Sequence, residues 1–116
     1  MSDCLFCKIS SGEIPADIVY EDDRVIAFRD IHPVAPVHIL IVPKTHVATM
    51  LELAARPDGS DLASAVLKVI PEIARKMQVD QSGFRLINNC GEEGGQTIPH
   101  VHFHLIGGRK LGEKLI

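Results

Sequence analysis

Short apolar runs with β-prone composition mark several segments of the 116-residue chain. Two such runs, 18–20 and 25–28, flank the polar stretch 21–24 and predict a hairpin with a tight turn. Residues 37–42 are apolar except for one histidine, which is typical of a central strand that ends at a proline. Two further strands are expected over 84–88 and 100–106.

Helical periodicity is clearest between residues 61 and 77, where apolar side chains recur every three or four positions. This pattern predicts an amphipathic helix with Ser60 or Asp61 as its N-cap. The periodicity continues after Pro71, which favours one helix over two.

Two shorter helices complete the prediction. One is expected to begin at an Asp3 cap and to stop before Gly12, and the other covers residues 47–55. Strands near both ends of the chain with helices at the start and in the middle indicate an α+β fold with a mostly antiparallel sheet. The length predicts a single domain over residues 1–116.

Composition narrows the classes of partner. With 46% hydrophobic residues and a formal charge of −3, the chain can bury a core without disulfides. It has no run of clustered basic residues, which argues against nucleic-acid and anionic-membrane partners. No apolar run is long enough to span a bilayer, and the first residues lack the features of a secretory signal, so a cytoplasmic location is expected.

Three of the six histidines lie in the segment His100-Val101-His102-Phe103-His104. In a strand their side chains would share one face, because side chains alternate with period two. Three imidazoles could hold a catalytic zinc ion. Alternatively, one imidazole could attack phosphorus while a protonated neighbour donates to the leaving group.

The preceding segment favours the second chemistry. Residues 91–97 contain three glycines that can turn backbone N–H groups toward an anion, and a zinc hydrolase would not need such a nest. Thr97 adds a hydroxyl that could relay a proton. Asp30 is a good acceptor for paired ribose hydroxyls, although a lone Asp after a strand is more often a turn residue.

These motifs together resemble the histidine triad (HIT) superfamily, and within it the Hint branch. The resemblance runs from Cys4 to Arg109 and is carried by the histidine segment, Asn88-Asn89, Gly94-Gly95-Gln96-Thr97, residues 27–31, residues 38–46 and Gly107-Gly108-Arg109. It implies a five-stranded antiparallel sheet with two main helices per subunit. It also implies a homodimer in which two subunits join their sheets across a two-fold axis.

The resemblance further implies hydrolysis of nucleotides substituted at the α-phosphate, chiefly purine nucleoside phosphoramidates built on AMP or GMP. Such catalysis requires no cofactor. His102 matches the nucleophile that forms a nucleotidyl-histidine intermediate, which water then cleaves. The implied supporting groups are His100, His104, His38 and Thr97 for catalysis, and Asp30 (ribose), Ile31 (base), Asn89, Gly95 and Gln96 for substrate binding.

Three features bear on the reaction type and on substrate choice. His104 stands where the transferase branch has glutamine, which favours hydrolysis. The short tail after Arg109, and Pro99 where many relatives have an aromatic residue, leave the leaving group open. A non-catalytic nucleotide-binding regulatory module and a dinucleoside polyphosphate hydrolase remain as alternatives.

Cys4-x-x-Cys7 has a spacing that indicates metal or redox chemistry in an intracellular protein. A tetrahedral structural zinc site needs two more ligands. The resemblance supplies them as His46 and His100. The other interpretation is a pair of reduced, partly buried cysteines on a short helix. If zinc takes His100, then His102 and His104 keep the chemistry.

Overall fold

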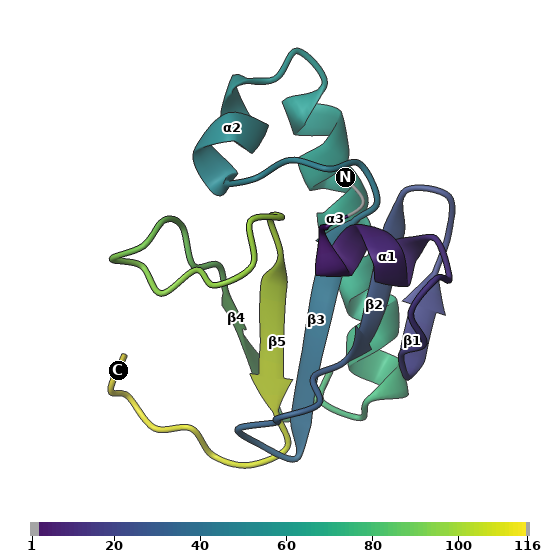
Figure 1. The fold of residues 1–116 in the computed structure, drawn as a ribbon. Coiled ribbons are helices and arrows are strands. Elements are labelled where there is room, and N and C mark those ends of the chain that lie inside the picture. Colours follow the sequence, from purple (N-terminus) through teal and green to yellow (C-terminus); the bar gives the residue numbers. More distant parts are fainter. Residues whose placement is uncertain (1–2, 116) are drawn as a thin grey trace.

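The structure is a computed structural model that describes residues 3–115. Its elements in chain order are α1 (Leu5–Ser10), β1 (Ile18–Glu21), β2 (Val25–Arg29), β3 (Val37–Pro43), α2 (Met50–Ala55), α3 (Gly59–Lys76), β4 (Phe84–Ile87) and β5 (Phe103–Gly107). The strands form one five-stranded sheet in the order β1-β2-β3-β5-β4 (Figure 1). All neighbouring strands are antiparallel, which confirms the predicted α+β fold.

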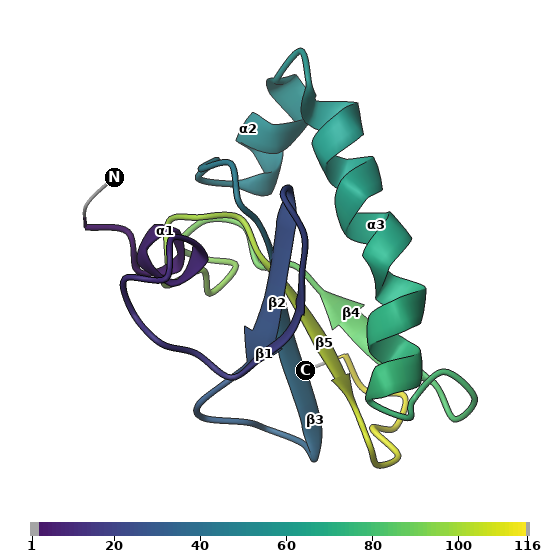
Figure 2. The same cartoon turned by 90° about the vertical axis from the view of Figure 1, so that its right-hand side faces the viewer.

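Both faces of the sheet are covered, as the view in Figure 2 shows, with α1 on one side and α3 on the other. The alternation along β2 separates the two cores, because Val25 and Ala27 pack with α3 whereas Ile26 and Phe28 pack with α1. All seven residues of β3 are buried. The apolar run that predicted a central strand therefore reflects burial on both faces.

The hairpin of β1 and β2 confirms the sequence prediction. Asp22 stabilises its turn, because the carboxylate Oδ1 accepts hydrogen bonds of 2.8 Å from the backbone N–H groups of both Arg24 and Val25. The long helix α3 runs through Pro71 as one helix, which confirms that the periodicity there belongs to a single element.

Three helix starts differ from the prediction. Cys4, not Asp3, caps α1, and its Sγ accepts from the Cys7 N–H at 3.4 Å. The second helix begins at Met50 rather than at residue 47, because the Thr49 hydroxyl caps it by accepting from the backbone N–H of Glu52.

The third difference concerns α3, whose N-cap is Asp58 rather than Ser60 or Asp61. The helix can begin two or three residues earlier, closer to α2, because Gly59 lacks a side chain. A Cβ at that position would collide with the backbone carbonyl of Leu53.

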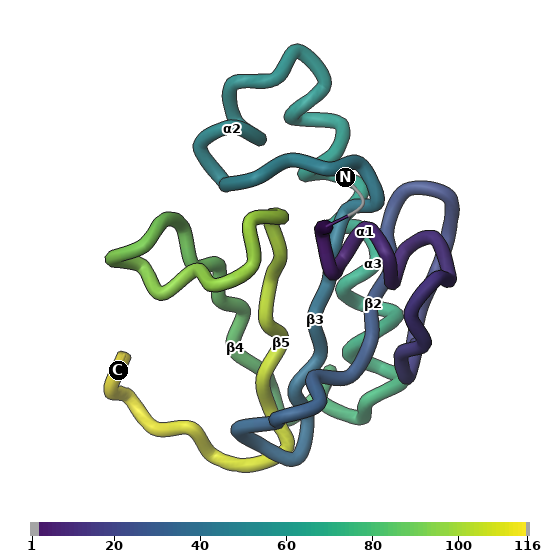
Figure 3. The backbone as a smooth tube through the Cα atoms, viewed as in Figure 1, coloured from purple at the N-terminus to yellow at the C-terminus, as the bar shows by residue number. Residues whose placement is uncertain are grey.

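The last strand is shorter than the expected 100–106, because regular pairing begins only at Phe103. Before it, the backbone N–H of Val101 donates to the Val47 carbonyl, outside the sheet. The tube in Figure 3 shows the glycine-rich segment between β4 and β5 as an extended loop, and the chain after β5 leading toward the β4 side. Within residues 3–115, no helix combines the length and apolarity needed to cross a membrane.

Candidate active site

A cavity of about 580 Å³ lies between α1 and the face of the sheet that α1 covers. Its walls are mostly apolar, and a few polar side chains converge in it, which is the usual composition of a small-molecule site. Its lining residues are Leu5, Phe6, Ile9, Ile14, Pro15, Ala16, Asp17, Phe28, Arg29, Asp30, Ile31, His32, Leu40, Thr97, Ile98, His102 and His104.

His102 lines this cavity in one defined tautomer. Its Nδ1 lies 2.8 Å from the backbone carbonyl oxygen of His100, and a carbonyl can only accept, so Nδ1 carries the proton. The lone pair of the ring is therefore on Nε2. The side chain is 5% exposed, and the ring of Phe6 packs edge-on against it with centroids 4.9 Å apart. No local pattern in the sequence indicated this role for Phe6.

His38 orients His104 through a hydrogen bond between the two rings. The backbone N–H of Val34 donates to His38 Nδ1 at 3.1 Å, which places the His38 proton on Nε2. That nitrogen lies 2.9 Å from His104 Nδ1 and donates to it, so His104 carries its own proton on Nε2. The prediction that His38 meets the histidine segment is confirmed.

His104 is also held neutral. Burial, followed by the proximity of His102 and His38, lowers the pKa of His104 from 6.5 to about 4. At neutral pH it is therefore an uncharged hydrogen-bond donor that lines the same cavity as His102. The ring centroids of His102 and His104 are 5.2 Å apart, so both can contact one small group.

Asp30 and Ile31 follow β2 and line the cavity. The Asp30 carboxylate accepts from the His32 backbone N–H at 2.8 Å, which fixes its direction. Its other oxygen lies 3.4 Å from His38 Nε2. Ile31 is 85% exposed although it is apolar, which suits a residue that covers a bound ligand.

The glycine-rich loop divides into residues that reach the cavity and residues that do not. Thr97 lines the cavity. Gln96 instead stabilises the loop, because its side-chain amide donates hydrogen bonds to the backbone carbonyls of Ala48 and Ile98. Gly95 has a φ of +84°, a conformation that favours glycine. Neither Gly95 nor Gln96 is a lining residue.

Asn89 lines a neighbouring depression of about 510 Å³, which is also lined by His38 and shares His104 with the main cavity. A residue that sequence reasoning did not assign to the site is its neighbour Asn88, whose side-chain amide donates to the His102 carbonyl at 2.9 Å. The pairing of β4 with β5 brings Asn88 there, and that pairing is not visible in the sequence.

His100 is turned away from the cavity and is fully buried. Its Nε2 donates to the Pro43 carbonyl at 2.8 Å, so the lone pair lies on Nδ1, 3.3 Å from Cys4 Sγ and 3.6 Å from Cys7 Sγ. His46 Nδ1 lies 3.3 Å from Cys7 Sγ. The expectation that the three histidines act on one face is thus wrong for the His100 ring, because the irregular backbone before β5 directs it to the cysteines.

The four side chains of Cys4, Cys7, His46 and His100 have the composition of a structural zinc site. Their ligand atoms all lie within 4.8 Å of one another. Two sulfurs and two imidazole nitrogens match a tetrahedral set, and the His100 contact with a carbonyl is the usual outer support of a zinc-bound histidine. Burial also lowers the pKa of His100, which keeps its ring neutral as ligation requires.

The same geometry opposes a zinc hydrolase built on the three clustered histidines. Among the described residues, the groups that could hold a metal place His100 with the cysteines and His104 with Asp30 and His38. His102 belongs to neither group.

Comparisons with known proteins show the family of the chain. The model of the HIT domain matches residues 11–111. The chain is 44% identical to a protein of Escherichia coli named purine nucleoside phosphoramidase, over 96% of this chain and 92% of that protein.

Two solved structures are similar over nearly the whole chain. One, a histidine triad protein from Clostridium difficile, is 49% identical, covers 98% of this chain and 97% of its own, and has a TM-score of 0.92. The other, a HIT family hydrolase from Clostridium thermocellum, is 42% identical, covers 100% of this chain and 99% of its own, and has a TM-score of 0.94. The chain belongs to the HIT domain family.

Proposed function

We propose that this protein is a nucleotide hydrolase that cleaves nucleoside monophosphates substituted at the α-phosphate, chiefly purine nucleoside phosphoramidates. The observation that carries the proposal is the tautomer of His102, whose Nε2 lone pair is available beside a cavity of nucleotide size. The name of the similar E. coli protein supports the same reaction.

In the first step, His102 Nε2 attacks the phosphorus and forms a P–N bond to the ring. The bond between phosphorus and the substrate amine breaks, and the amine takes up a proton relayed from water through the Thr97 hydroxyl. The ring becomes positively charged, and its Nδ1–H remains bonded to the His100 carbonyl, whose dipole stabilises that charge.

In the second step, a water molecule attacks the same phosphorus, breaks the P–N bond to His102 and gives its proton to the hydroxide left by the first step. The nucleoside monophosphate leaves, and the net reaction consumes one water. His104 Nε2–H donates to a phosphate oxygen in both steps, because its low pKa keeps this donor uncharged and its orientation is fixed by His38.

Asp30 is proposed to accept from the ribose hydroxyls and Ile31 to cover the base. Both line the cavity on the loop that follows β2. Thr97 lines the same cavity. One bound substrate can therefore contact Asp30 through its sugar and Thr97 through its phosphate.

The test is turnover of an adenosine phosphoramidate by the purified protein in excess chelator, compared with His102→Ala. We expect the variant to lose at least about a thousandfold in kcat, because the nucleophile is gone. Binding of AMP serves as the folding control. A covalent nucleotide trapped on His102 and located by mass spectrometry would support the intermediate, whereas undiminished turnover by His102→Ala would refute it.

The same assay separates the alternatives. A non-catalytic nucleotide-binding module would bind AMP without turnover. A dinucleoside polyphosphate hydrolase would prefer a second nucleotide as leaving group over an amine.

We further propose that Cys4, Cys7, His46 and His100 hold a structural zinc ion. Bound zinc would supply a cross-link between the start of α1 and the segment before β5, and it would take no part in the reaction. Phe6, between the two cysteines, would then be fixed against His102. Because zinc binding needs reduced cysteines, the proposal also favours a cytoplasmic location.

Metal analysis of the purified chain tests this proposal. We expect about one zinc per chain, loss of zinc in Cys7→Ser, and a lower melting temperature after chelation. Cys90→Ser is the matched control, because Cys90 is a free cysteine outside the cluster. A chain with intact ligands that takes up no zinc at micromolar concentration would contradict the proposal.

A homodimer is the third proposal. The edge strand β4 carries two exposed apolar side chains, Phe84 at 39% and Leu86 at 37%. An uncovered apolar edge strand readily pairs with another chain. Light scattering coupled to size-exclusion chromatography should give a mass near twice 12.7 kDa, and a monomeric mass would contradict the proposal.

A further inference from the structure

The depression of about 510 Å³ beside the active-site cavity contains a charged side chain that the proposed reaction does not use. His104 lines both the cavity and the depression, so a phosphate held by His104 has one of them on either side. The lining of the depression includes three polar side chains, those of His38, Arg85 and Asn89, and three apolar ones, those of Val34, Ile106 and Leu115.

The strand register places Arg85 on the same face of the sheet as His38. Ile106 on β5 is the cross-strand partner of both Arg85 on β4 and His38 on β3. Directly opposite residues in an antiparallel sheet point to the same face. That face is the one that α1 covers, because Leu40, two residues after His38, packs with α1. Two strand spacings of about 4.8 Å each, or roughly 10 Å, separate the backbones of Arg85 and His38.

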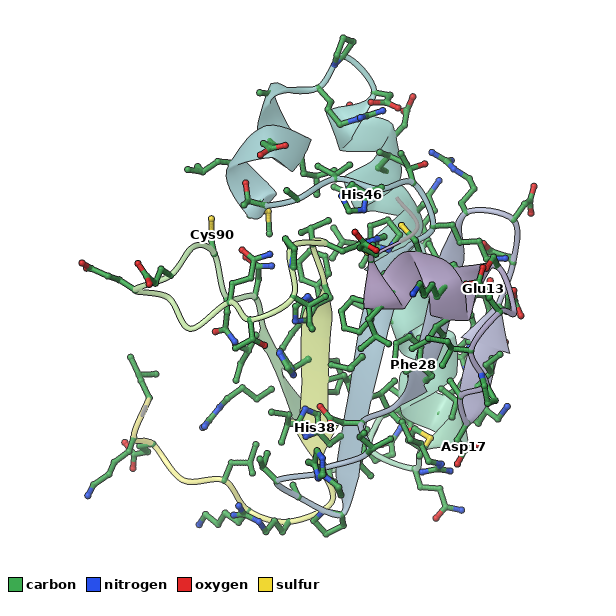
Figure 4. The ribbon with its side chains drawn as sticks, in the orientation of Figure 1. Glu13, Asp17, Phe28, His38, His46 and Cys90 are labelled. Atoms are coloured by element: carbon green, nitrogen blue, oxygen red, sulfur yellow. The ribbon has the colours of Figure 1, made fainter. Side chains whose placement is uncertain are left out.

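The cavity and the depression lie on opposite sides of β5. Phe28 on β2 lines the cavity, whereas Arg85 on β4 lines the depression. Figure 4 shows Phe28 on one side of β5 and Cys90, the residue after Asn89, on the other. The attacking and leaving atoms lie roughly in line at phosphorus, so the leaving amine points away from His102 and does not share the position of the nucleoside. With the nucleoside in the cavity, the amine extends toward Arg85.

Arg85 keeps donors free for a ligand. Within residues 3–115, no carboxylate lines the depression and none pairs with Arg85. Arg85 Nη2 donates to the Gly112 carbonyl at 2.7 Å. A guanidinium has five N–H donors in one plane, so this contact orients the side chain and leaves other donors for a carboxylate.

The proposed dimer contact uses the other face of β4. Leu86 is the cross-strand partner of Leu105, which packs with α3. Phe84 and Leu86 therefore point to the α3 face, and Arg85 between them points to the face of the histidines. A dimer that pairs through Phe84 and Leu86 leaves Arg85 beside the depression.

We propose that Arg85 binds an acidic group on the leaving amine, so that the protein prefers amines that carry a carboxylate over neutral amines. This inference rests on the proposed function, because it needs a nucleotide with its phosphate at His102 and His104. The guanidinium pairs with the carboxylate, while Ile106 and Leu115 contact the carbon chain that joins it to the nitrogen. A second phosphate would also offer negative charge, but it has no carbon chain for these apolar side chains.

The experiment measures binding by calorimetry in full chains that carry His102→Ala and therefore do not consume the ligand. The two main probes are AMP joined through nitrogen to β-alanine and AMP joined in the same way to β-alaninamide, which differ only in the charged end group. We expect the β-alanine conjugate to bind about fivefold more tightly, and we expect Arg85→Gln to remove most of this preference. A general effect of the lost Gly112 contact would weaken both conjugates equally and leave the preference unchanged.

Arg75→Gln is the matched control, because Arg75 is an exposed arginine of α3, which covers the opposite face of the sheet. It removes the same charge and should leave the preference for the carboxylate in place. ADP is the third probe and tests whether a second phosphate is the preferred anion.

Each outcome decides the inference. A preference that is absent at the start, that survives Arg85→Gln, or that falls equally in Arg75→Gln would overturn it. A larger loss for ADP than for the β-alanine conjugate in Arg85→Gln would assign Arg85 to a phosphate and would also overturn it. Turnover of both conjugates is measured separately with His102 intact. Selective binding without any turnover would uphold the inference and refute the proposed function, whereas turnover with no dependence of the preference on Arg85 would do the reverse.

Discussion

Replacing His104 with glutamine should flatten the dependence of stability on acid pH. In the folded protein the pKa of His104 is lowered from 6.5 to about 4, mainly by burial. In the unfolded chain, His104 therefore binds a proton below about pH 6.5, whereas in the folded chain it binds this proton only below about pH 4. Above pH 6.5 both states are neutral at this residue, and the stability is complete. As the pH falls from 6.5 to 4, stability is lost, and below pH 4 the loss is constant.

The magnitude follows from the size of the pKa change. A fall from 6.5 to about 4 corresponds to about 3.4 kcal/mol, at about 1.4 kcal/mol per pH unit. Because the ring is only partly buried and borders a cavity open to water, we expect about 2 kcal/mol.

Urea unfolding at fixed protein concentration, at pH 7.0, 6.0, 5.0 and 4.0, measures the effect. Gln cannot titrate, so the difference in unfolding free energy between wild type and His104→Gln should change by about 2 kcal/mol across this range. Titrating groups that do not contact His104, such as His100, cancel in that difference. If the two proteins lose stability in parallel, the neutral state assigned to His104 is wrong.

Three further predictions follow from single contacts. Phe6→Ala should lower the unfolding free energy by about 3–5 kcal/mol in urea titrations, because it empties a buried ring site beside His102, and a loss below 1 kcal/mol would contradict this packing. Gly59→Ala should lower the melting temperature by several degrees, since its Cβ meets the Leu53 carbonyl. Gly112→Ala meets no atom within 4 Å, so it should cost only the strain of an alanine at a φ of +83° and be milder. Asn88→Ala should lower kcat about tenfold in the phosphoramidate assay, with KM little changed. The reason is that the lost hydrogen bond holds the backbone of His102 and not the ligand. An unchanged kcat would exclude this positioning role.

The strands of the sheet were predicted well because each strand and turn corresponds to a local pattern of apolar and polar residues. The uniformly apolar stretch of β3 and the polar turn at Asp22 each act within a few residues. Helix starts were less predictable, since a cap depends on which nearby side chain reaches a free N–H. The cap of α1 by Cys4 and the close approach of Gly59 to α2 depend on tertiary contacts, which the sequence pattern does not reveal.

The candidate site shows the same division between local and long-range information. Strand periodicity placed His102 and His104 correctly at the cavity, because β5 or its immediate approach holds both. It misplaced the His100 ring, because regular pairing starts only at Phe103 and the preceding backbone bonds to Val47 instead.

That irregular approach to β5 also explains how one short segment can serve two purposes. A regular strand would point His100 and His102 in parallel, and both rings would compete for the cavity. With the chain turned before Phe103, the His100 ring lies among the cysteines while its backbone carbonyl still holds the proton of His102 Nδ1. The side chain and the main chain of one residue thus connect the cysteine cluster to the proposed nucleophile. Replacing Cys4 with serine should therefore disturb the pH dependence of hydrolysis as well as stability, and a variant with lower stability but an unaltered pH profile would show that the two sites act independently.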